Sequence, residues 1–347
     1  MNRPLTGSLI FLTTVCMYLH AQPVDSVRLM FYNVENLFDT FDDPAVNDNE
    51  FLPSGKKHWT PDHYQSKIAN LTKAIAAAGE WNMPAIIGLC EIENRKVLND
   101  LFLYSALSRY NYRIVHFDSP DPRGIDVAMA YLPSRFKLLK AFPVPVPLPD
   151  QETTRDILYC KGVLMHTDTI HLLINHWPSR RGGATSIKKR KKAALVARHL
   201  VDSIFFAQTG TKIILMGDFN DEPEDESLKN VLQAKTSRDI PCDTSLYILS
   251  AGYLRKNNYG SIKYRGHWAV FDHIIVSGSL LRAGHGYCTR PSLFRIFHYP
   301  FLLLPDRSHT GFTPFPSFQG LRWLNGFSDH LPVGLDLFSP CHVLSLP

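Results

Sequence analysis

The chain has 347 residues, of which 45% are hydrophobic and 20% are charged, and its formal net charge is +5. This composition is typical of a globular protein with a sizeable core, and the modest positive charge permits phosphorylated ligands without requiring a nucleic acid. No Gly/Ser-rich or acidic linker and no internal repeat divides the chain, so an architecture of several domains or of repeats is not expected.

The N-terminal residues 1–21 have the pattern of a secretory signal peptide. Arg3 supplies the positive charge, residues 9–19 form a short apolar stretch, and Ala21 is the small residue at the expected cleavage site. The apolar stretch is too short to span a bilayer comfortably, and no later segment is long and apolar enough for a transmembrane segment. We therefore expect a secreted or periplasmic protein whose mature part, residues 22–347, is a single domain.

Apolar periodicity and turn residues predict the secondary structure in chain order. Strands are expected at residues 27–34, 85–91, 112–117, 125–132, 157–166, 169–176, 212–217, 268–277 and 331–338. Helices are expected at residues 61–80, 94–109, 186–207 and 222–233. Prolines at positions 143, 145, 147 and 149 indicate an extended segment, and residues 38–60 and 291–327 are expected to be long loops. Several strands follow one another without a helix between them, which favours two mixed sheets packed face to face with helices outside.

Polar residues follow several of the apolar, β-rich runs. These segments are Tyr32-Asn33-Val34-Glu35-Asn36, Gly88-Leu89-Cys90-Glu91, Met216-Gly217-Asp218-Phe219-Asn220 and Ser328-Asp329-His330-Leu331-Pro332. The ends of buried strands are where a packed sheet can present acids, amides and imidazoles at a cleft. This oxygen-rich set suits a hard divalent cation and a phosphate ester. The scattered cysteines, by contrast, have no zinc-binding spacing.

These segments resemble the endonuclease/exonuclease/phosphatase superfamily, which includes DNase I, exonuclease III-type enzymes, inositol-polyphosphate phosphatases and neutral sphingomyelinases. Asn33, Glu91, Gly217-Asp218-Phe219-Asn220, Phe271-Asp272-His273 and Ser328-Asp329-His330 occur in the family's order, over roughly residues 27–338. The runs at residues 121–128 and 175–183 look like a secreted bacterial branch of that family. The resemblance implies an α/β fold, a four-layer sandwich of two packed mixed sheets flanked by helices. It also implies a single catalytic domain with Mg²⁺ as cofactor, or Mn²⁺ or Ca²⁺ in its place.

Three residues are candidate metal ligands. Glu91 ends a buried strand, where a carboxylate can bind Mg²⁺ while the ion retains several waters. Asn33 also follows an apolar strand, and its amide can serve the metal site or the phosphate. Asp329 is expected to contribute to metal or water binding.

The candidate catalytic residues follow from the same resemblance. Asp218 and Asn220 are two positions apart and point the same way in an extended turn; in the family this pair orients the nucleophile and the pentacovalent transition state. His330 is expected to be the general base or an electrostatic partner, with Asp272 fixing its tautomer and raising its basicity.

A second carboxylate–imidazole pair is also expected. His176 ends a predicted strand at a position resembling the second active-site histidine of DNase I, and Asp156 of Arg155-Asp156 resembles the acid that orients it. Arg180 and Arg181, which precede two glycines, are candidate phosphate ligands alongside Asn220.

Three further features are interpreted as structural or as departures from the family. The basic run at residues 188–192 is more typical of a solvated helix face than of a nucleic-acid site, and Asp126 is expected to be structural. DNase I-like members carry an arginine two residues after the metal-binding Glu. Here that position is Glu93, which argues against reading a DNA groove in the DNase I manner.

Together these residues predict a metal-dependent phosphoric ester hydrolase in which an oriented water attacks phosphorus in line. A nuclease acting on DNA or RNA is the first choice, because the isoelectric point of about 8.8 favours polyanions. A phosphoesterase acting on a lipid, a phosphoinositide or sphingomyelin is the alternative, since the aromatic segment 294–318 could face a lipid or a sugar. A non-catalytic binding protein on the same fold is a third reading, and the intact polar set argues against it.

Overall fold

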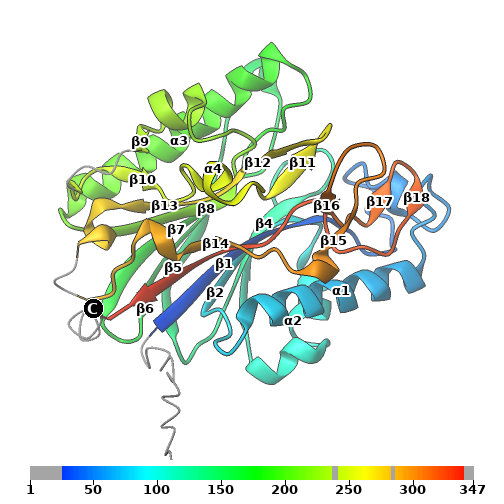
Figure 1. Cartoon of the computed structure of the whole chain (residues 1–347), viewed down its shortest axis with the longest axis horizontal. Coiled ribbons are helices and arrows are strands. Elements are labelled where there is room, and N and C mark those ends of the chain that lie inside the picture. Colours follow the sequence, from blue (N-terminus) through cyan, green and yellow to red (C-terminus); the bar gives the residue numbers. More distant parts are fainter. Residues whose placement is uncertain (1–25, 237–240, 283–285, 340–347) are drawn as a thin grey trace, which may run out of the picture.

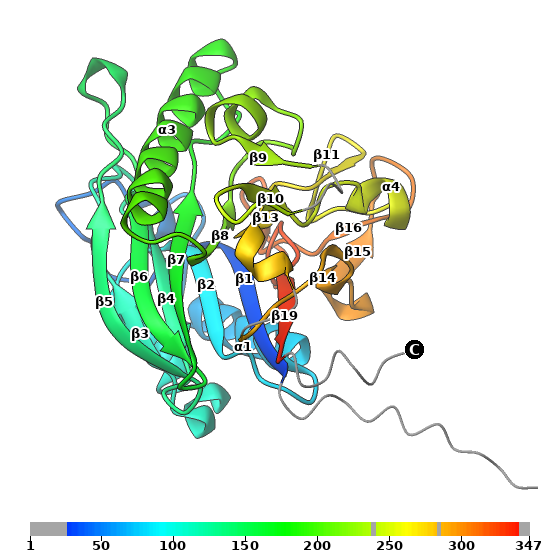
Figure 2. The ribbon, with the colours of Figure 1, turned by 90° about the vertical axis from the view of Figure 1, so that its left-hand side faces the viewer.

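Two mixed β-sheets pack face to face in this computed structural model, which describes residues 26–236, 241–282 and 286–339 (Figures 1 and 2). The first sheet has the strand order β14 (Phe294–Ile296), β19 (Val333–Phe338), β1 (Ser26–Leu37), β2 (Ile86–Ile92), β4 (Asp126–Tyr131) and β3 (Arg113–His116). The second has the order β5 (Phe136–Val144), β6 (Ile157–Leu164), β7 (Asp168–His176), β8 (Lys212–Asp218), β13 (Asp272–Ser277), β10 (Leu246–Ile248) and β9 (Ala234–Lys235). The predicted fold of two packed mixed sheets is confirmed.

Helices cover the outer faces of both sheets. Helices α1 (Pro61–Gly79) and α2 (Arg95–Phe102) lie on the first sheet, and α3 (Ala184–Ala207) lies on the second (Figures 1 and 2). A short helix α4 (Tyr253–Asn257) and three hairpins complete the described part of the chain: β11 (Ile262–Tyr264) with β12 (His267–Ala269), β15 (Leu303–Pro305) with β16 (Phe312–Pro314), and β17 (Phe318–Gln319) with β18 (Arg322–Trp323). No helix in this part of the chain has the length and hydropathy to cross a bilayer. The predicted signal peptide, residues 1–21, lies outside the described residues.

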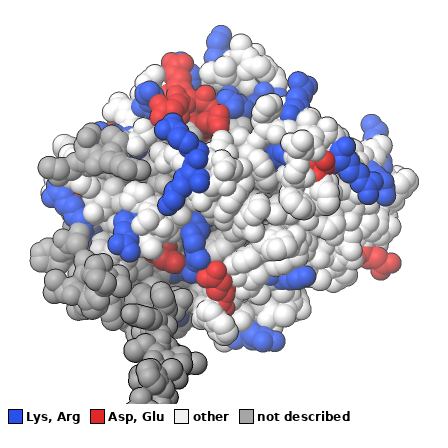
Figure 3. Space-filling view, in the orientation of Figure 1, with Lys and Arg blue, Asp and Glu red and all other residues white. Residues whose placement is uncertain are grey.

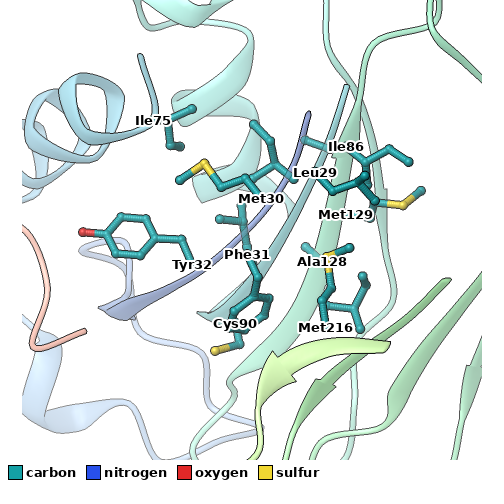
Figure 4. Close-up of a cluster of buried hydrophobic side chains, with 14 of the residues drawn as sticks. Leu29, Met30, Phe31, Tyr32, Ile75, Ile86, Cys90, Ala128, Met129 and Met216 are labelled. Atoms are coloured by element: carbon teal, nitrogen blue, oxygen red, sulfur yellow. The ribbon is translucent and has the colours of Figure 1, made fainter. Parts of the chain in front are cut away.

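The core between the sheets depends on close approach at Gly88. Gly88 pairs with Phe31 across β2 and β1, and a Cβ on Gly88 would lie 2.9 Å from Met216 Sδ and 3.2 Å from Ile174 Cδ1 of the other sheet. Met30 and Tyr32, which alternate with Phe31 along β1, point toward α1 instead (Figure 4). Both faces of β1 are therefore buried, which accounts for its continuous apolar sequence.

Two of the predicted helices are shorter than expected. The helix expected at residues 94–109 begins as predicted, with the Asn94 side chain accepting from the Val97 N–H at 3.0 Å, but it ends at Phe102. A separate 3₁₀ turn, Ala106–Tyr110, follows because the Ser105 hydroxyl accepts from Leu107 N–H and starts a new element. The helix expected at residues 222–233 is reduced to a single π-helical turn, Ser227–Val231.

The strands of three segments also differ from the prediction. The strand expected at 268–277 is interrupted, because β12 ends at Ala269 and β13 begins at Asp272. The proline-containing segment begins inside a strand, β5, which lies at the edge of its sheet, where Pro143 needs no inward N–H. The expected loop at 291–327 contains β14 and the β15–β16 and β17–β18 hairpins.

Helix α3 is held to the second sheet by a buried arginine within the basic run 188–192. Lys188 is exposed as predicted and Lys189 is half-buried beside Glu152, but Arg190 is only 2% exposed and pairs with Asp221 at 2.8 Å (Nε to Oδ1). Its guanidinium also donates to the Ser179 carbonyl at 3.2 Å. Arg190 thus ties the segment after β7 to the segment after β8.

We expect the Arg190→Met variant to lose about 3–5 kcal/mol of unfolding free energy, because it removes the nearer and buried cation of the Asp221 carboxylate and leaves only the exposed Arg180, at 3.5 Å. Lys188→Met, on the exposed face of the same helix, should change stability by no more than about 0.5 kcal/mol. Urea unfolding followed by circular dichroism measures both. Equal stabilities of the two variants would contradict this role for Arg190.

Candidate active site

Strand register brings three of the predicted catalytic residues side by side. His176 at the end of β7 pairs with Asp218 at the end of β8, and Asp218 pairs with Asp272 at the start of β13. Directly paired residues on neighbouring strands point to the same face of a sheet. The second sheet therefore presents one imidazole and two carboxyl groups next to one another on three neighbouring strands, facing the first sheet.

The first sheet contributes Asn33 and Glu91 through irregular strand ends. Asn33 pairs with Cys90, after which the register of β2 shifts. Glu91 has a positive φ of 61°, as do Glu35 (51°) and Asn36 (52°) after Asn33. Regular alternation would turn Glu91 away from the face that Asn33 and Cys90 share, and the bulge re-aims its carboxylate toward Asn33. Left-handed backbone at non-glycine residues is strained and is found most often at functional sites.

The Asn33 amide joins the two sheets. Its Nδ2 lies 3.1 Å from Asp218 Oδ2 and 3.3 Å from Glu91 Oε1. The second Glu91 oxygen accepts from the Asn36 N–H at 2.8 Å, and the Ser328 hydroxyl donates to the Asn33 carbonyl at 2.7 Å. Each carboxylate oxygen of Glu91 is thereby held in a defined direction.

His330 and Asp272 form the predicted carboxylate–imidazole pair. His330 Nδ1 lies 2.7 Å from Asp272 Oδ2, and both side chains are buried. The other ring nitrogen, Nε2, lies 3.8 Å from Asp218 Oδ2. Burial opposes protonation of the ring, but the Asp272 and Asp218 carboxylates outweigh it and raise the pKa of His330 well above its ordinary value.

Burial also shifts the pKa values of Asp218 and His176. Desolvation raises the pKa of Asp218 to about 7, against the opposing charge of His330 and with the support of the Asp272 carboxylate. Desolvation also lowers the pKa of His176 well below its ordinary value, and the Arg155 and Arg123 guanidiniums act in the same direction. His176 Nε2 lies 3.7 Å from Glu91 Oε1 and 3.8 Å from Asp218 Oδ2. Groups with such shifts in one cleft are typical of active sites.

The donor set fits a divalent cation. Ligand atoms of Asp218, Asp272 and His330 lie within 4.8 Å of one another, and Asp272 Oδ1 is buried with no hydrogen-bond partner in the part of the chain that the structure describes. Glu91 and Asn33 add a carboxylate and an amide beside Asp218. Carboxylate and amide oxygens are the ligands that Mg²⁺ and Ca²⁺ prefer.

Two hydrogen bonds hold Asn220 beside Asp218 and Trp177. Its backbone N–H donates to Asp218 Oδ1 at 2.9 Å, and its Nδ2 donates to the Trp177 carbonyl at 3.0 Å. The backbone of Asn220 has a positive φ of 53°, which asparagine tolerates better than most residues. Asp218 and Asn220 therefore lie together, as their spacing predicts.

A cleft of about 280 Å³ lies among the β11–β12, β15–β16 and β17–β18 hairpins, and Asp329, the chain neighbour of His330, belongs to its lining. Glu35 and the exposed Asp329 line its inner end. The remaining lining residues are Lys263, Arg265, Gly266, Leu304, Asp306, Ser308, His309, Thr313, Pro314, Pro316, Phe318, Gln319 and Leu324. The cleft thus has acidic groups inside, an apolar wall from the later hairpins, and a polar, partly cationic lip. Asp329 lines the cleft and also lies near enough to His330 and Glu91 for their charges to act on its carboxyl group.

Sequence reasoning assigned no role to two residues of this region, the buried Lys67 and the half-buried Glu35. Lys67 of α1 donates to the Phe327 carbonyl at 2.7 Å and to the Ser317 hydroxyl, and it lies 3.8 Å from Glu35 Oε2. Glu35 accepts from the Ser317 N–H at 2.6 Å. The signal was available, because Lys67 occupies the apolar face of α1 between Tyr64 and Leu71. These contacts anchor the loop that forms one wall of the cleft.

The predicted Asp156–His176 pair is not formed. No hydrogen bond joins the two side chains, and His176 Nδ1 and Asp156 Oδ1 are both buried without a partner among the described residues. Instead Arg155 reaches the loop after His176, donating to the Trp177 carbonyl at 2.8 Å. Neighbouring side chains of an extended segment alternate, so Asp156 turns away and lines a small separate cavity with Ser119.

Other candidate residues have defined partners of their own. Arg180 pairs with Asp225 at 2.9 Å, so it is not a free phosphate clamp here, whereas Arg181 is exposed. Glu93 is 7% exposed and accepts from the Asp39 N–H at 2.5 Å, with burial raising its pKa to about 8. Glu93 therefore supports a loop and does not face a ligand. Asp126 bonds His116 at 2.9 Å, consistent with a structural role.

Comparisons with solved structures show the same fold. D. rerio TDP2 complexed with a single-strand DNA product has a TM-score of 0.55 at 14% identity, over 90% of this chain and 99% of that chain. The human Nocturnin catalytic domain with bound sulfate has a TM-score of 0.54 at 18% identity, over 91% and 96%. A Bacteroides thetaiotaomicron protein of the endonuclease/exonuclease/phosphatase family has a TM-score of 0.51 at 15% identity, over 91% and 98%. No curated protein sequence matches the chain.

The family assignment comes from the sequence as well. A model of the Endonuclease/Exonuclease/phosphatase family matches residues 28–338, which span both sheets and every residue of the cluster described above. With the shared fold and the buried carboxylate–imidazole cluster, this match means that the chain belongs to the endonuclease/exonuclease/phosphatase family of metal-dependent phosphoesterases.

Proposed function

We propose that this chain is a secreted or periplasmic, Mg²⁺-dependent phosphodiesterase that hydrolyses nucleic acid. The observation that supports it most directly is the convergence of Asn33, Asp218 and the His330–Asp272 pair at the open end of both sheets. An ester phosphate can reach this point through the cleft that begins at Asp329. The proposal that the chain is exported is supported by the N-terminal pattern that ends at Ala21.

The residues divide the work of an in-line displacement. Asp218 and Asn220 orient the attacking water, and Asp218 takes its proton as the new P–O bond forms and the opposite ester bond breaks. His330, with Nδ1 held by Asp272, presents Nε2 to the charge that develops on the phosphoryl oxygens. Glu91, Asn33 and Asp329 would hold the cation, which supplies Lewis acidity toward the phosphate and the leaving oxygen.

The shape of the cleft favours a nucleotide over a lipid. Its wall contains the flat ring of Phe318, which can pack a sugar or a base, and Arg265 at its lip has no ion pair with a described residue. On the face shown in Figure 3, lysines and arginines are scattered among neutral side chains and form no broad basic surface. We therefore propose that substrate is contacted locally, at the cleft. The DNA product in D. rerio TDP2 is consistent with this choice.

A lipid or sphingomyelin-type substrate is the second candidate. The apolar wall formed by Leu304, Pro314 and Leu324 beside an acidic inner end suits an amphiphilic ester. The limited cleft volume of about 280 Å³ leaves little room for an acyl chain. For this reason the lipid is ranked below the nucleotide.

The direct test is hydrolysis of a substrate panel by the mature chain with Mg²⁺: single- and double-stranded DNA, RNA, phosphoinositides, sphingomyelin and bis(p-nitrophenyl) phosphate. We expect hydrolysis of nucleic acid that stops in excess EDTA and returns with Mg²⁺. Glu91→Gln, a neutral isostere, should raise the half-saturating Mg²⁺ concentration by at least about tenfold, as even residues behind a metal ligand do. Activity that persists in EDTA would refute metal dependence, and turnover of sphingomyelin alone would select the second candidate.

We expect His330→Ala to lower kcat by about 10²-fold or more, the scale of a positioned group acting in the transition state. Asp272→Asn should cause a smaller loss, because the imidazole remains but loses its charged partner. Steady-state kinetics beside a melting curve decide between roles. A folded His330→Ala protein with near-normal kcat would remove His330 from the mechanism.

We expect the exported chain to begin near Gln22. The short apolar stretch and Ala21 form the cleavage pattern. N-terminal sequencing of protein recovered outside the cytoplasm provides the measurement, and detection of Met1 on that material would refute cleavage.

A further inference from the structure

A buried series of hydrogen bonds leads from Asp121 through Arg155 and the Trp177 carbonyl to Asn220. Arg155 donates through one terminal nitrogen to Asp121 Oδ2 at 2.8 Å and through the other to the Trp177 carbonyl at 2.8 Å. The same carbonyl accepts from Asn220 Nδ2 at 3.0 Å. Asp121, Arg155 and Trp177 are at most 5% exposed. None of the proposed steps uses them.

The backbone and the side chain of Trp177 are both held in place by neighbouring residues. Its N–H donates to the Asp218 carbonyl at 2.9 Å, its indole nitrogen donates to Asn175 Oδ1 at 3.1 Å, and its ring packs edge-on against Phe219 with centroids 4.8 Å apart. Arg155 then donates to the other backbone group of Trp177, its carbonyl. A buried carbonyl held by a charged donor has little freedom to turn.

Asp121 holds the guanidinium in place from the other side. It accepts from Arg155 and from the Arg123 N–H at 3.0 Å. The two guanidiniums outweigh burial and lower the pKa of Asp121, so the carboxylate remains ionised. Arginine suits this position because its planar fork can bind a carboxylate and a carbonyl in fixed directions at once, which a lysine ammonium cannot.

The consequence reaches Asn220 through its amide. One Nδ2 hydrogen is committed to Trp177, and the backbone N–H is committed to Asp218. These bonds fix the orientation of the side-chain amide. The amide oxygen and the second Nδ2 hydrogen remain available for water and phosphate. A freely flipping amide would present the wrong group part of the time.

We propose that Arg155, held by Asp121, is a positioning residue that orients the amide of Asn220 through the Trp177 carbonyl. Arg155 is buried and touches no reacting atom. Its hydrogen bonds lead to Asn220, whereas its charge also bears on His176, and the cycle with Asn220 described below separates the two effects. This inference rests on the proposed function, because it assigns a role within that reaction. It also assigns a role to Asp121, the acidic residue at the start of the run at residues 121–128.

The test is a double-mutant cycle between Arg155 and Asn220, measured with a fluorogenic phosphodiester in Mg²⁺. We expect Arg155→Ala to lower kcat by about 10–100-fold, the range seen for residues that orient a working side chain, with KM changed much less. In the Asn220→Ala background the same substitution should cause almost no further loss, because the group it orients is gone. Added guanidinium should restore part of the kcat of Arg155→Ala only when Asn220 is present.

Arg198→Ala is the matched control, since Arg198 is also buried but bonds the Leu232 carbonyl and Asp202, away from Asn220. It should lower the melting temperature and leave kcat unchanged. If Arg155→Ala does not fold, Arg155→Lys takes its place in the cycle, with a smaller loss that again disappears without Asn220. Multiplicative losses in the double variant, or a folded Arg155 variant with normal kcat, would overturn the inference alone. A wild-type chain inactive on every ester would overturn the proposed function and the inference with it.

Discussion

Carboxyl groups buried close together repel each other and lose their hydration, and the composition of the site follows from that constraint. Asp218 and Asp272 are 2% and 1% exposed and are paired across neighbouring strands. An imidazole that contacts both, His330, and an amide that bridges to the other sheet, Asn33, offset the repulsion. Asn33 reaches Asp218 only because the sheets pack closely, which the missing side chain of Gly88 permits. The site therefore depends on the distance between the sheets.

The site residues that the sequence predicted from its own pattern are those that lie at the ends of strands. An apolar run followed by polar residues marks where a buried strand leaves the core, and neighbouring strands leave it at the same edge. Asn33, Glu91 and Asp218 were found in that way, together with the two-sheet fold. The family's order of motifs added Asp272 and His330, each of which lies where a strand starts and not where one ends.

The parts that the sequence did not predict depend on where long or neighbouring side chains turn. Arg190 lies within a run of cations, and no local pattern distinguishes the one that folds inward. Lys67 breaks the polarity of a helix face and was overlooked because its neighbours made the helix amphipathic. Asp156 was paired with His176 by analogy, but the segment just before β6 places Arg155 there instead. One residue of alternation decides which of two adjacent side chains enters the site.

The proline-bearing strand β5 has a consequence for how the folded molecule meets its own copies. An edge strand exposes unpaired backbone groups that can recruit a strand from another molecule, and proteins oppose this with lysine and proline on the edge. β5 is such an edge, and it carries Lys137, Lys140 and Pro143, with three further prolines directly after it. These residues deny a second chain a regular ladder along the open side of the larger sheet. Resistance to edge-to-edge aggregation is thus built into the same segment that closes the sheet.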